Sequence, residues 1–244
     1  MSDDRPAEAA ADTGYSPDRW AFDEEVTRVF DDMLARSVPQ YEVMRRLVFE
    51  IGSRFVTPAT CVVDLGCSRG EAMRPFVDRF GAHNRFVGVE RSAPMLAAAR
   101  TAYAGLLVSR TVDILDVDLR VKYPPVSASL TLCVLTLQFT PIEHRQRILR
   151  AVYDSTVAGG ALVLVEKILG ADDVGNALLV SHYEEMKRQN GYTEEEIARK
   201  RLALEGVLVP VTARWNEDLL GWAGFKHVEC FWRVLNFAAW VAMK

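Results

Sequence analysis

The stretch from Cys61 to Gly70 constrains the fold more strongly than any other part of the chain. It opens with an apolar run around Val62, which is typical of a strand buried on both faces. It closes in a turn bracketed by two glycines, and an amphipathic helix is predicted over residues 71–80. Strand, glycine turn and helix form the first unit of a doubly wound α/β domain, in which ligands bind at the carboxyl ends of the strands.

Three kinds of site are compatible with this turn. A dinucleotide site needs G-x-G-x-x-G, but Ser68 stands where the second glycine is required. A hydrolase nucleophile elbow needs G-x-S-x-G, which residues 66–70 match. In the D-x-G-x-x-x-G turn typical of class I methyltransferases, Asp64, Gly66 and Gly70 would hold the amino acid end of S-adenosylmethionine.

The next predicted strand favours the third kind of site. Residues 86–89 form a second apolar run, and Glu90 follows it directly. An acid at this position can accept hydrogen bonds from both ribose hydroxyls of a nucleoside, whereas a hydrolase has no use for it. The pattern therefore favours a methyltransferase-type site over a hydrolase or another nucleotide ligand.

Composition limits the size of the fold and the class of partner. The 244 residues are 50% hydrophobic, which suits one large domain with a sizeable core. The net charge is −4, and no face is obviously basic, so direct binding of nucleic acid is not expected.

The four cysteines are far apart and lie mostly in apolar runs, so we expect reduced thiols in a cytoplasmic protein. No cysteine or histidine pair has zinc-ligand spacing, and we expect no metal site. Residues 1–23 lack the apolar core of a signal peptide. No run approaches the ~20 apolar residues of a membrane span, and no membrane association is expected.

Strands and helices alternate in the prediction for most of the chain. After the first two strands we expect strands at 112–115, 128–134 and 161–165, with helices at 92–103, 141–154 and 216–222, and an antiparallel pair at 226–233 and 237–243. The predicted fold is Rossmann-like, of the class I S-adenosylmethionine-dependent methyltransferase type. Its seven-stranded sheet is mostly parallel, with an antiparallel C-terminal strand.

Three segments fall outside this alternation. Residues 1–19 are rich in Ala, Asp and Pro and are predicted to be a disordered tail before a domain at 20–244. Residues 20–58 predict two helices separated near Pro39, which could form a lid over the ligand. Residues 168–211 predict a helical insertion after strand five, with a capping box at Thr193 and Glu196 that starts a helix running to Leu208.

Further candidate ligand contacts follow the third and fourth strands. An acid after strand three would meet the adenine amino group, and Asp118 is favoured over its neighbour Asp116, although a solvated loop carboxylate is the simpler interpretation. Strand four ends at Val134, beside the expected position of the transferring group. Within the insertion, the basic run at 199–201 could be solvated charge, and His182 is a weak candidate for a base.

Several separated motifs together match one known family. They are FDE at 22–24, RSVPQY at 36–41, DLGCS at 64–68, TLQF at 136–139, GGALVL at 159–164, NGY at 190–192 and KR at 200–201. From Phe22 to the C-terminus the chain resembles the carboxy-S-adenosyl-L-methionine synthase family. The resemblance implies a transferase that converts S-adenosylmethionine and prephenate to carboxy-S-adenosylmethionine and phenylpyruvate.

The resemblance also implies a biological setting. A partner enzyme of the family transfers the carboxymethyl group to a wobble uridine of tRNA, so the synthase itself need not touch RNA, in keeping with the acidic balance. The family's carboxylate-binding arginine falls on Arg201, which in family structures acts across a homodimer interface, and the family's cofactor-contacting tyrosine falls on Tyr41. The other implied contacts are Gly66, Cys67 and Ser68 at the amino acid end, Glu90 and Arg91 at the ribose side, and Asp118 and Leu119 at the adenine.

Two departures keep other functions open. Glu90-Arg91 replaces the family's common Asp-Asn, and the longer Glu can still bridge two hydroxyls. Val134 stands where the family usually has Asn beside the reacting end of the cofactor, and Cys133 makes this wall still more apolar. A methyltransferase of a small metabolite, or a recruited paralogue with altered chemistry in a specialised pathway, therefore remains an alternative. A degenerate, non-enzymatic fold is disfavoured by the intact Asp64 and glycine turn.

Overall fold

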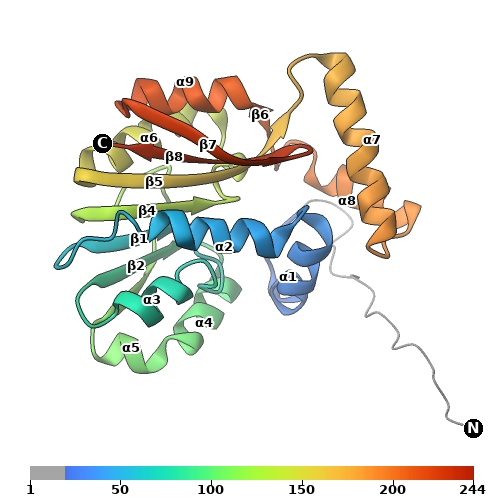
Figure 1. Ribbon diagram of the computed structural model, residues 1–244. Helices are drawn as coiled ribbons and strands as arrows, with labels where there is room; N and C mark the ends of the chain where they lie inside the picture. Colours follow the sequence, from blue (N-terminus) through green and yellow to red (C-terminus); the bar gives the residue numbers. More distant parts are fainter. Residues whose placement is uncertain (1–19) are drawn as a thin grey trace, which may run out of the picture.

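A mostly parallel sheet forms the centre of the computed structural model, which describes residues 20–244 (Figure 1). The expected disordered tail lies outside these residues. The strand order is β3-β2-β1-β4-β5-β8-β7, with β6 paired to β5. The strands are β1 (Cys61–Leu65), β2 (Arg85–Glu90), β3 (Val112–Asp116), β4 (Ala128–Val134), β5 (Thr156–Leu169), β6 (Val211–Thr212), β7 (His227–Val234) and β8 (Phe237–Met243).

The pairing confirms the predicted sheet. Strands β1 to β5 pair in parallel, whereas β8 runs antiparallel between β5 and β7. The sequence did not predict β6, because two residues are too few to show an alternating pattern. Strand β5 also begins earlier than expected: the glycines at 159 and 160, predicted to precede the strand, lie inside it where the register with β4 shifts.

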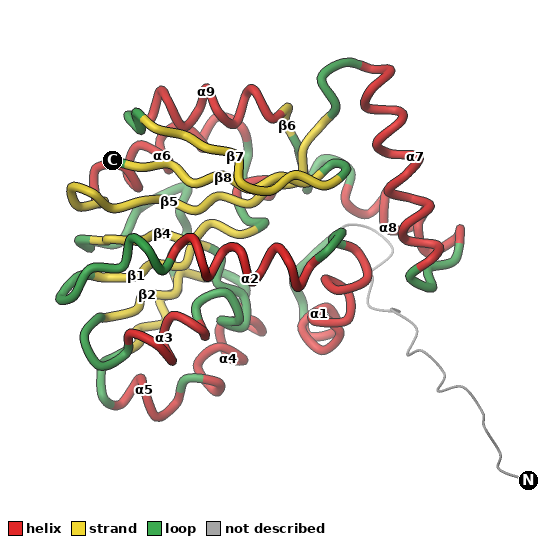
Figure 2. Tube along the Cα trace, in the orientation of Figure 1, coloured by secondary structure: helices red, strands yellow, loops and turns green. Residues whose placement is uncertain are grey.

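Helices cover both faces of the sheet (Figure 2). They are α1 (Glu24–Ser37), α2 (Tyr41–Gly52), α3 (Arg74–Phe80), α4 (Ala93–Ala102), α5 (Ala104–Val108), η1 (Leu137–Phe139), α6 (Ile142–Ser155), α7 (Asp173–Gln189), α8 (Glu194–Leu204) and α9 (Ala213–Ala223). Helix α3 begins later than predicted, because residues 71–73 form a turn and Pro75 occupies the first turn of the helix.

Two apolar clusters lie on opposite sides of the central strands. Val62 of β1 packs in a cluster that includes residues of α2 and α3, whereas its neighbour Val63 packs in a cluster that includes residues of α6 and α9. Successive side chains of a strand point to opposite faces, so both faces of β1 are buried, as its apolar run predicted.

Helices α1, α7 and α8 lie together beyond the end of the sheet from which β5 leads into α7 (Figure 1). A third apolar cluster joins α1 to α4 and α8 through Phe30, Met95 and Ala203. The Thr193–Glu196 capping box that begins α8 is confirmed. The helix ends at Leu204 rather than Leu208, and Gly206 follows with a φ of 68°. These helices therefore stand where ligands of this sheet type bind.

Candidate functional site

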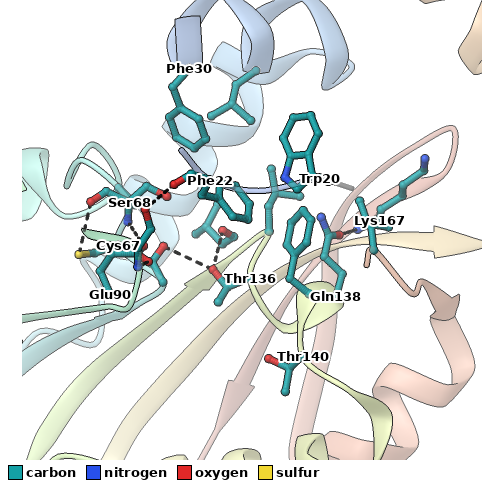
Figure 3. Close-up of a pocket in the computed structure, with 18 of the residues that line it drawn as sticks. Trp20, Phe22, Phe30, Cys67, Ser68, Glu90, Thr136, Gln138, Thr140 and Lys167 are labelled. Carbon is teal, nitrogen blue, oxygen red and sulfur yellow. Dashed lines mark hydrogen bonds between the residues drawn. The ribbon is translucent and has the colours of Figure 1, made fainter. Parts of the chain in front are cut away.

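A cavity of about 650 Å³ lies at the carboxyl ends of the parallel strands. Figure 3 shows Ser68 and Glu90 on one side of it, and Gln138 and Lys167 on the other. Ten of the residues singled out from the sequence line this cavity, whereas Gly70 and Arg201 do not. The ten are Tyr41, Asp64, Gly66, Cys67, Ser68, Glu90, Arg91, Asp118, Leu119 and Val134.

Different steric constraints require glycine at the two glycine positions of the turn. Gly66 has a φ of 69°, and a Cβ built there would lie 2.4 Å from Thr136 Oγ1, so only glycine fits against the loop that follows β4. Gly70 has a φ of 92°, and its Cβ would lie 2.3 Å from the ring of Tyr103. The Tyr103 hydroxyl donates a hydrogen bond to the Gly70 carbonyl at 2.7 Å. Gly70 therefore has a packing role, and its expected contact with a ligand stays a prediction.

The Glu90 carboxylate connects the turn to the end of β2. Its Oε2 accepts a hydrogen bond from the Ser68 amide at 2.9 Å, and its Oε1 accepts from the amides of Arg91 and Ser92 at 2.7 and 2.8 Å. A carboxylate has about four lone-pair positions, so these three hydrogen bonds leave capacity for about one ribose hydroxyl. Glu90 thus holds the turn in shape and can still accept from a ligand.

Two non-glycine residues of the cavity wall have left-handed backbone conformations. Ser68 has a φ of 50° and Leu135 a φ of 57°. Such conformations cost of order 1–3 kcal/mol and cluster at ligand sites, where the surrounding structure enforces them. Both follow the ends of adjacent central strands, β1 and β4.

The part of the cavity around Asp64, where the amino acid end of a nucleoside is expected, is called the amino acid corner. The Asp64 carboxylate can accept a further hydrogen bond there. Asp64 is 1% exposed, and its Oδ2 has no hydrogen-bond partner within residues 20–244. Burial raises the pKa of Asp64 to about 7, against the opposing field of Arg45. Arg45 donates a hydrogen bond to the Glu71 carbonyl and also lines the cavity. A buried acid beside a guanidinium suits a zwitterion.

Sequence reasoning missed Arg45. The signal was its spacing: Arg45 follows Tyr41 by four residues on α2, so both side chains lie on the same helix face. Burial raises the pKa of Tyr41, which also lines the cavity.

The loop after β3 brings Asp118 to Arg91. Asp118 Oδ2 lies 3.2 Å from Arg91 Nη1, and it accepts a hydrogen bond from Arg120 Nη2 at 2.7 Å. Its negative charge is therefore balanced by two guanidinium groups. Leu119 adds an apolar surface beside it on the cavity wall. Arg91, predicted for the ribose side, therefore lies next to Asp118 and Leu119, predicted for the adenine side.

The other side of the cavity carries two lysines among apolar walls. Val134, Tyr183 and Phe237 line it together with Lys167 and Lys200. Lys167 Nζ lies 4.7 Å from the centre of the Tyr183 ring, and burial lowers the pKa of Lys167 to about 8. Sequence reasoning did not single out Lys167, although it lies near the carboxyl end of the parallel strand β5, where ligands of this sheet type bind.

Lys200 differs from a solvated charge. It is 5% exposed and donates hydrogen bonds to Ser37 Oγ and Tyr192 Oη at 3.2 and 3.3 Å. These contacts join α8 to the end of α1. The idea that the whole basic run of α8 is solvated is therefore wrong for Lys200.

Arg201 faces away from the cavity of its own chain. Its side chain is 72% exposed, and Nη1 lies 3.3 Å from Glu184 Oε1 on α7. Arg201 follows the buried Lys200 directly, so the helix turns the two side chains to different faces.

No histidine of residues 20–244 lines the cavity, including His182. Ser68 therefore has no imidazole base in the cavity wall, as a serine hydrolase would require. Within the same residues, no helix combines the length and apolar character needed to span a membrane.

Comparison with known proteins agrees with this geometry. A family model described as a methyltransferase domain matches residues 62–160. Among solved structures, an O-methyltransferase family protein from Burkholderia thailandensis shares 17% identity at a TM-score of 0.65, covering 91% of this chain and 60% of that chain. Human N-acetylserotonin methyltransferase in complex with SAM shares 16% identity at 0.61, covering 91% and 55%. These likenesses establish the class I methyltransferase fold.

Curated relatives give the family. Carboxy-S-adenosyl-L-methionine synthase of Methylococcus capsulatus is 42% identical over 93% of this chain and 94% of its own. The protein of the same name from Wolinella succinogenes is 38% identical over 93% and 94%. The chain therefore belongs to the carboxy-S-adenosyl-L-methionine synthase family.

Proposed function

We propose that this protein carboxylates the methyl group of S-adenosylmethionine, with prephenate as the source of the carboxyl group. The observation that carries the proposal is one cavity with a nucleoside-type turn on one side and a partly buried lysine, Lys167, on the other (Figure 3). Membership of the family, at up to 42% identity over nearly the whole chain, supports the same reaction.

The residues of the turn side fit S-adenosylmethionine. The ammonium group of S-adenosylmethionine would donate a hydrogen bond to Oδ2 of Asp64, and its carboxylate would pair with Arg45. A ribose hydroxyl would donate to the remaining acceptor position of Glu90, while Asp118 and Leu119 would hold the adenine. Only glycine fits at position 66 against Thr136, so no Cβ projects from this residue into the turn.

The proposed reaction balances without an added oxidant or reductant. Prephenate loses carbon dioxide and its ring hydroxide as it becomes aromatic phenylpyruvate. The hydroxide takes one proton from the sulfonium methyl group and leaves as water. The methyl carbon then forms a bond to the carbon dioxide. An apolar wall such as Val134 and Leu135 would favour this capture, because it keeps water away from the reacting carbon.

Arg201 would act in the cavity of a second copy of the chain. An exposed guanidinium can bind the new carboxylate through two parallel hydrogen bonds. Its neighbour Leu202 is 71% exposed, and Leu178 on α7 is 58% exposed. Exposed apolar side chains on α7 and α8, the two helices joined by the Arg201–Glu184 pair, support a homodimer contact on this surface.

The alternative is a methyltransferase that acts on a small metabolite. Val134 favours it, because an apolar side chain replaces the hydrogen-bonding Asn of the family at this wall. Release of S-adenosylhomocysteine with a candidate acceptor, independent of prephenate, would identify this activity.

Mass spectrometry of the nucleoside after incubation with S-adenosylmethionine tests the proposal. We expect a product heavier by the carboxyl group only when prephenate is present. Unchanged S-adenosylmethionine, or S-adenosylhomocysteine alone, would contradict it.

A further inference from the structure

Lys167 is fixed in the cavity wall through its backbone and its ring contact. Its amide donates a hydrogen bond to Gln138 Oε1 at 2.7 Å, and it pairs with Phe237 across the β5–β8 ladder. Tyr183, the ring beneath its ammonium group, itself packs on Phe237 with the ring centres 5.6 Å apart. The ammonium group therefore extends from a rigid base, on the side of the cavity opposite Ser68 (Figure 3).

The Lys167 ammonium has no hydrogen bond or ion pair within residues 20–244. Its neighbours are the Tyr183 ring and, at longer range, the carboxylate of Glu184. Glu184 is already paired with Arg201. On the Tyr183 ring the Lys187 ammonium lies 5.2 Å from the centre, which adds a like charge to the same ring. A partly buried cation with so little compensation favours an anionic ligand.

We propose that the Lys167 ammonium binds a carboxylate of the small acid that reacts with S-adenosylmethionine, and so sets the specificity of the cavity for anionic co-substrates. The inference rests on the proposed function, which requires an acid on this side of the cavity. It assigns that acid a protein contact within its own subunit, separate from the Arg201 contact to the product.

Other cations of the cavity are less suitable for this contact. Arg91 and Arg120 both pair with Asp118. Lys200 already donates to Ser37 and Tyr192, contacts that hold α8 against α1. Arg45 lies in the amino acid corner, where its positive charge opposes the rise that burial causes in the pKa of Asp64 and of Tyr41. Lys167 combines a place among apolar side chains with an uncommitted ammonium group.

The cost of keeping Lys167 protonated in the cavity wall also favours binding of an acid. Burial lowers the pKa of Lys167 to about 8, so the free protein is protonated there at neutral pH at some energetic cost. A carboxylate beside the ammonium group relieves that cost and raises its pKa. Binding of the acid should therefore weaken as the pH rises well above about 8.

Calorimetry on the full chain saturated with S-adenosylhomocysteine tests the contact. We expect Lys167→Met to weaken prephenate binding about 10- to 100-fold, the range of a charge-assisted hydrogen bond. Affinity for S-adenosylhomocysteine should stay within about twofold, since Lys167 lies across the cavity. Lys167→Arg should recover most of the loss, because it restores the charge.

Lys187→Met is the matched control. Lys187 lies on the same Tyr183 ring but does not line the cavity, so its loss should weaken prephenate binding far less than the loss of Lys167 does. Equal prephenate binding by wild type and Lys167→Met, or no prephenate binding by wild type, would overturn the inference. Lys167-dependent binding without a carboxylated product would instead overturn the proposed reaction and leave the anion contact intact.

Discussion

Lys200 and Arg201 are consecutive residues of α8 that serve different surfaces. Lys200 is 5% exposed and lines the cavity, whereas the Arg201 side chain is 72% exposed and pairs with Glu184. An exposed cation outside its own cavity can reach a second subunit in the proposed homodimer. The arrangement leads to a prediction that separates binding of the nucleoside from retention of the product.

Arg201→Leu should abolish retention of the carboxylated product and leave binding of S-adenosylmethionine mostly intact. The reason is that Arg201 does not line the cavity of its own chain, where the nucleoside is proposed to bind. Mass spectrometry of the nucleoside that co-purifies, with calorimetry for S-adenosylmethionine, provides the measurement. Arg199→Leu, also at an exposed position of α8, is the control and should behave as wild type. Equal loss of both ligands in Arg201→Leu would show a structural role.

Arg45→Ala should weaken S-adenosylhomocysteine about tenfold or more, since it removes a charged hydrogen-bond donor from the proposed carboxylate site. Affinity for 5′-methylthioadenosine, which lacks the amino acid end, should hardly change. Titration calorimetry with both ligands compares the two losses. Arg46→Ala is the matched control, because Arg46 lies next in α2, pairs with Glu50 and is absent from the cavity wall. A similar loss for both nucleosides would refute the assignment.

The pH dependence of ligand binding should follow Asp64. Its folded-state pKa of about 7 lies above its ordinary value of 3.8, so the folded protein keeps a proton that the unfolded chain releases. Asp64 therefore makes the ligand-free protein less stable as the pH rises from about 4 to about 7, and its effect is constant above that range. A bound ammonium favours the ionised carboxylate, so affinity for S-adenosylhomocysteine should increase as the pH rises through about 7.

The shift in melting temperature caused by S-adenosylhomocysteine, measured across this pH range, reports this linkage. Asp64→Asn should show a smaller shift that no longer grows with pH through this range. A wild-type shift that stays flat would show that Asp64 does not bind the ammonium group.

Gly66→Ala should destabilise the protein by at least about 1 kcal/mol, because alanine resists a φ of 69° and its methyl group would meet Thr136. It should also weaken nucleoside binding by deforming the turn. Gly221→Ala is the control: it lies in α9 with open space where an added Cβ would stand, and should gain up to about 1 kcal/mol. Urea denaturation of both variants measures the difference. An unchanged midpoint for Gly66→Ala would mean that the turn is not strained.

Local patterns were sufficient to predict most of the fold. The apolar run around Val62 indicates a strand buried on both faces, and the alternation of runs and helices that follows it gives the parallel sheet. The pattern failed where an element was too short or where a turn precedes a helix. Strand β6 has two residues, and Glu71 belongs to a turn rather than to α3.

The two sides of the cavity differed in how far the sequence could predict them. The turn side follows from contiguous motifs, because Asp64, Gly66 and Glu90 end adjacent parallel strands. Lys167 and Lys200 come from elements that meet only in three dimensions, so no local spacing brings them together. Residues that converge from β5 and α8 therefore had to be found in the structure.

Isotopic labelling of prephenate tests the central claim most directly. The enzyme would be incubated with S-adenosylmethionine and prephenate that carries a heavy carbon in the carboxyl group on its ring, and the nucleoside analysed by mass spectrometry. The account predicts carboxy-S-adenosylmethionine with the heavy carbon in its new carboxyl group. An unlabelled carboxylated product, or a nucleoside that has lost its methyl group instead, would contradict it.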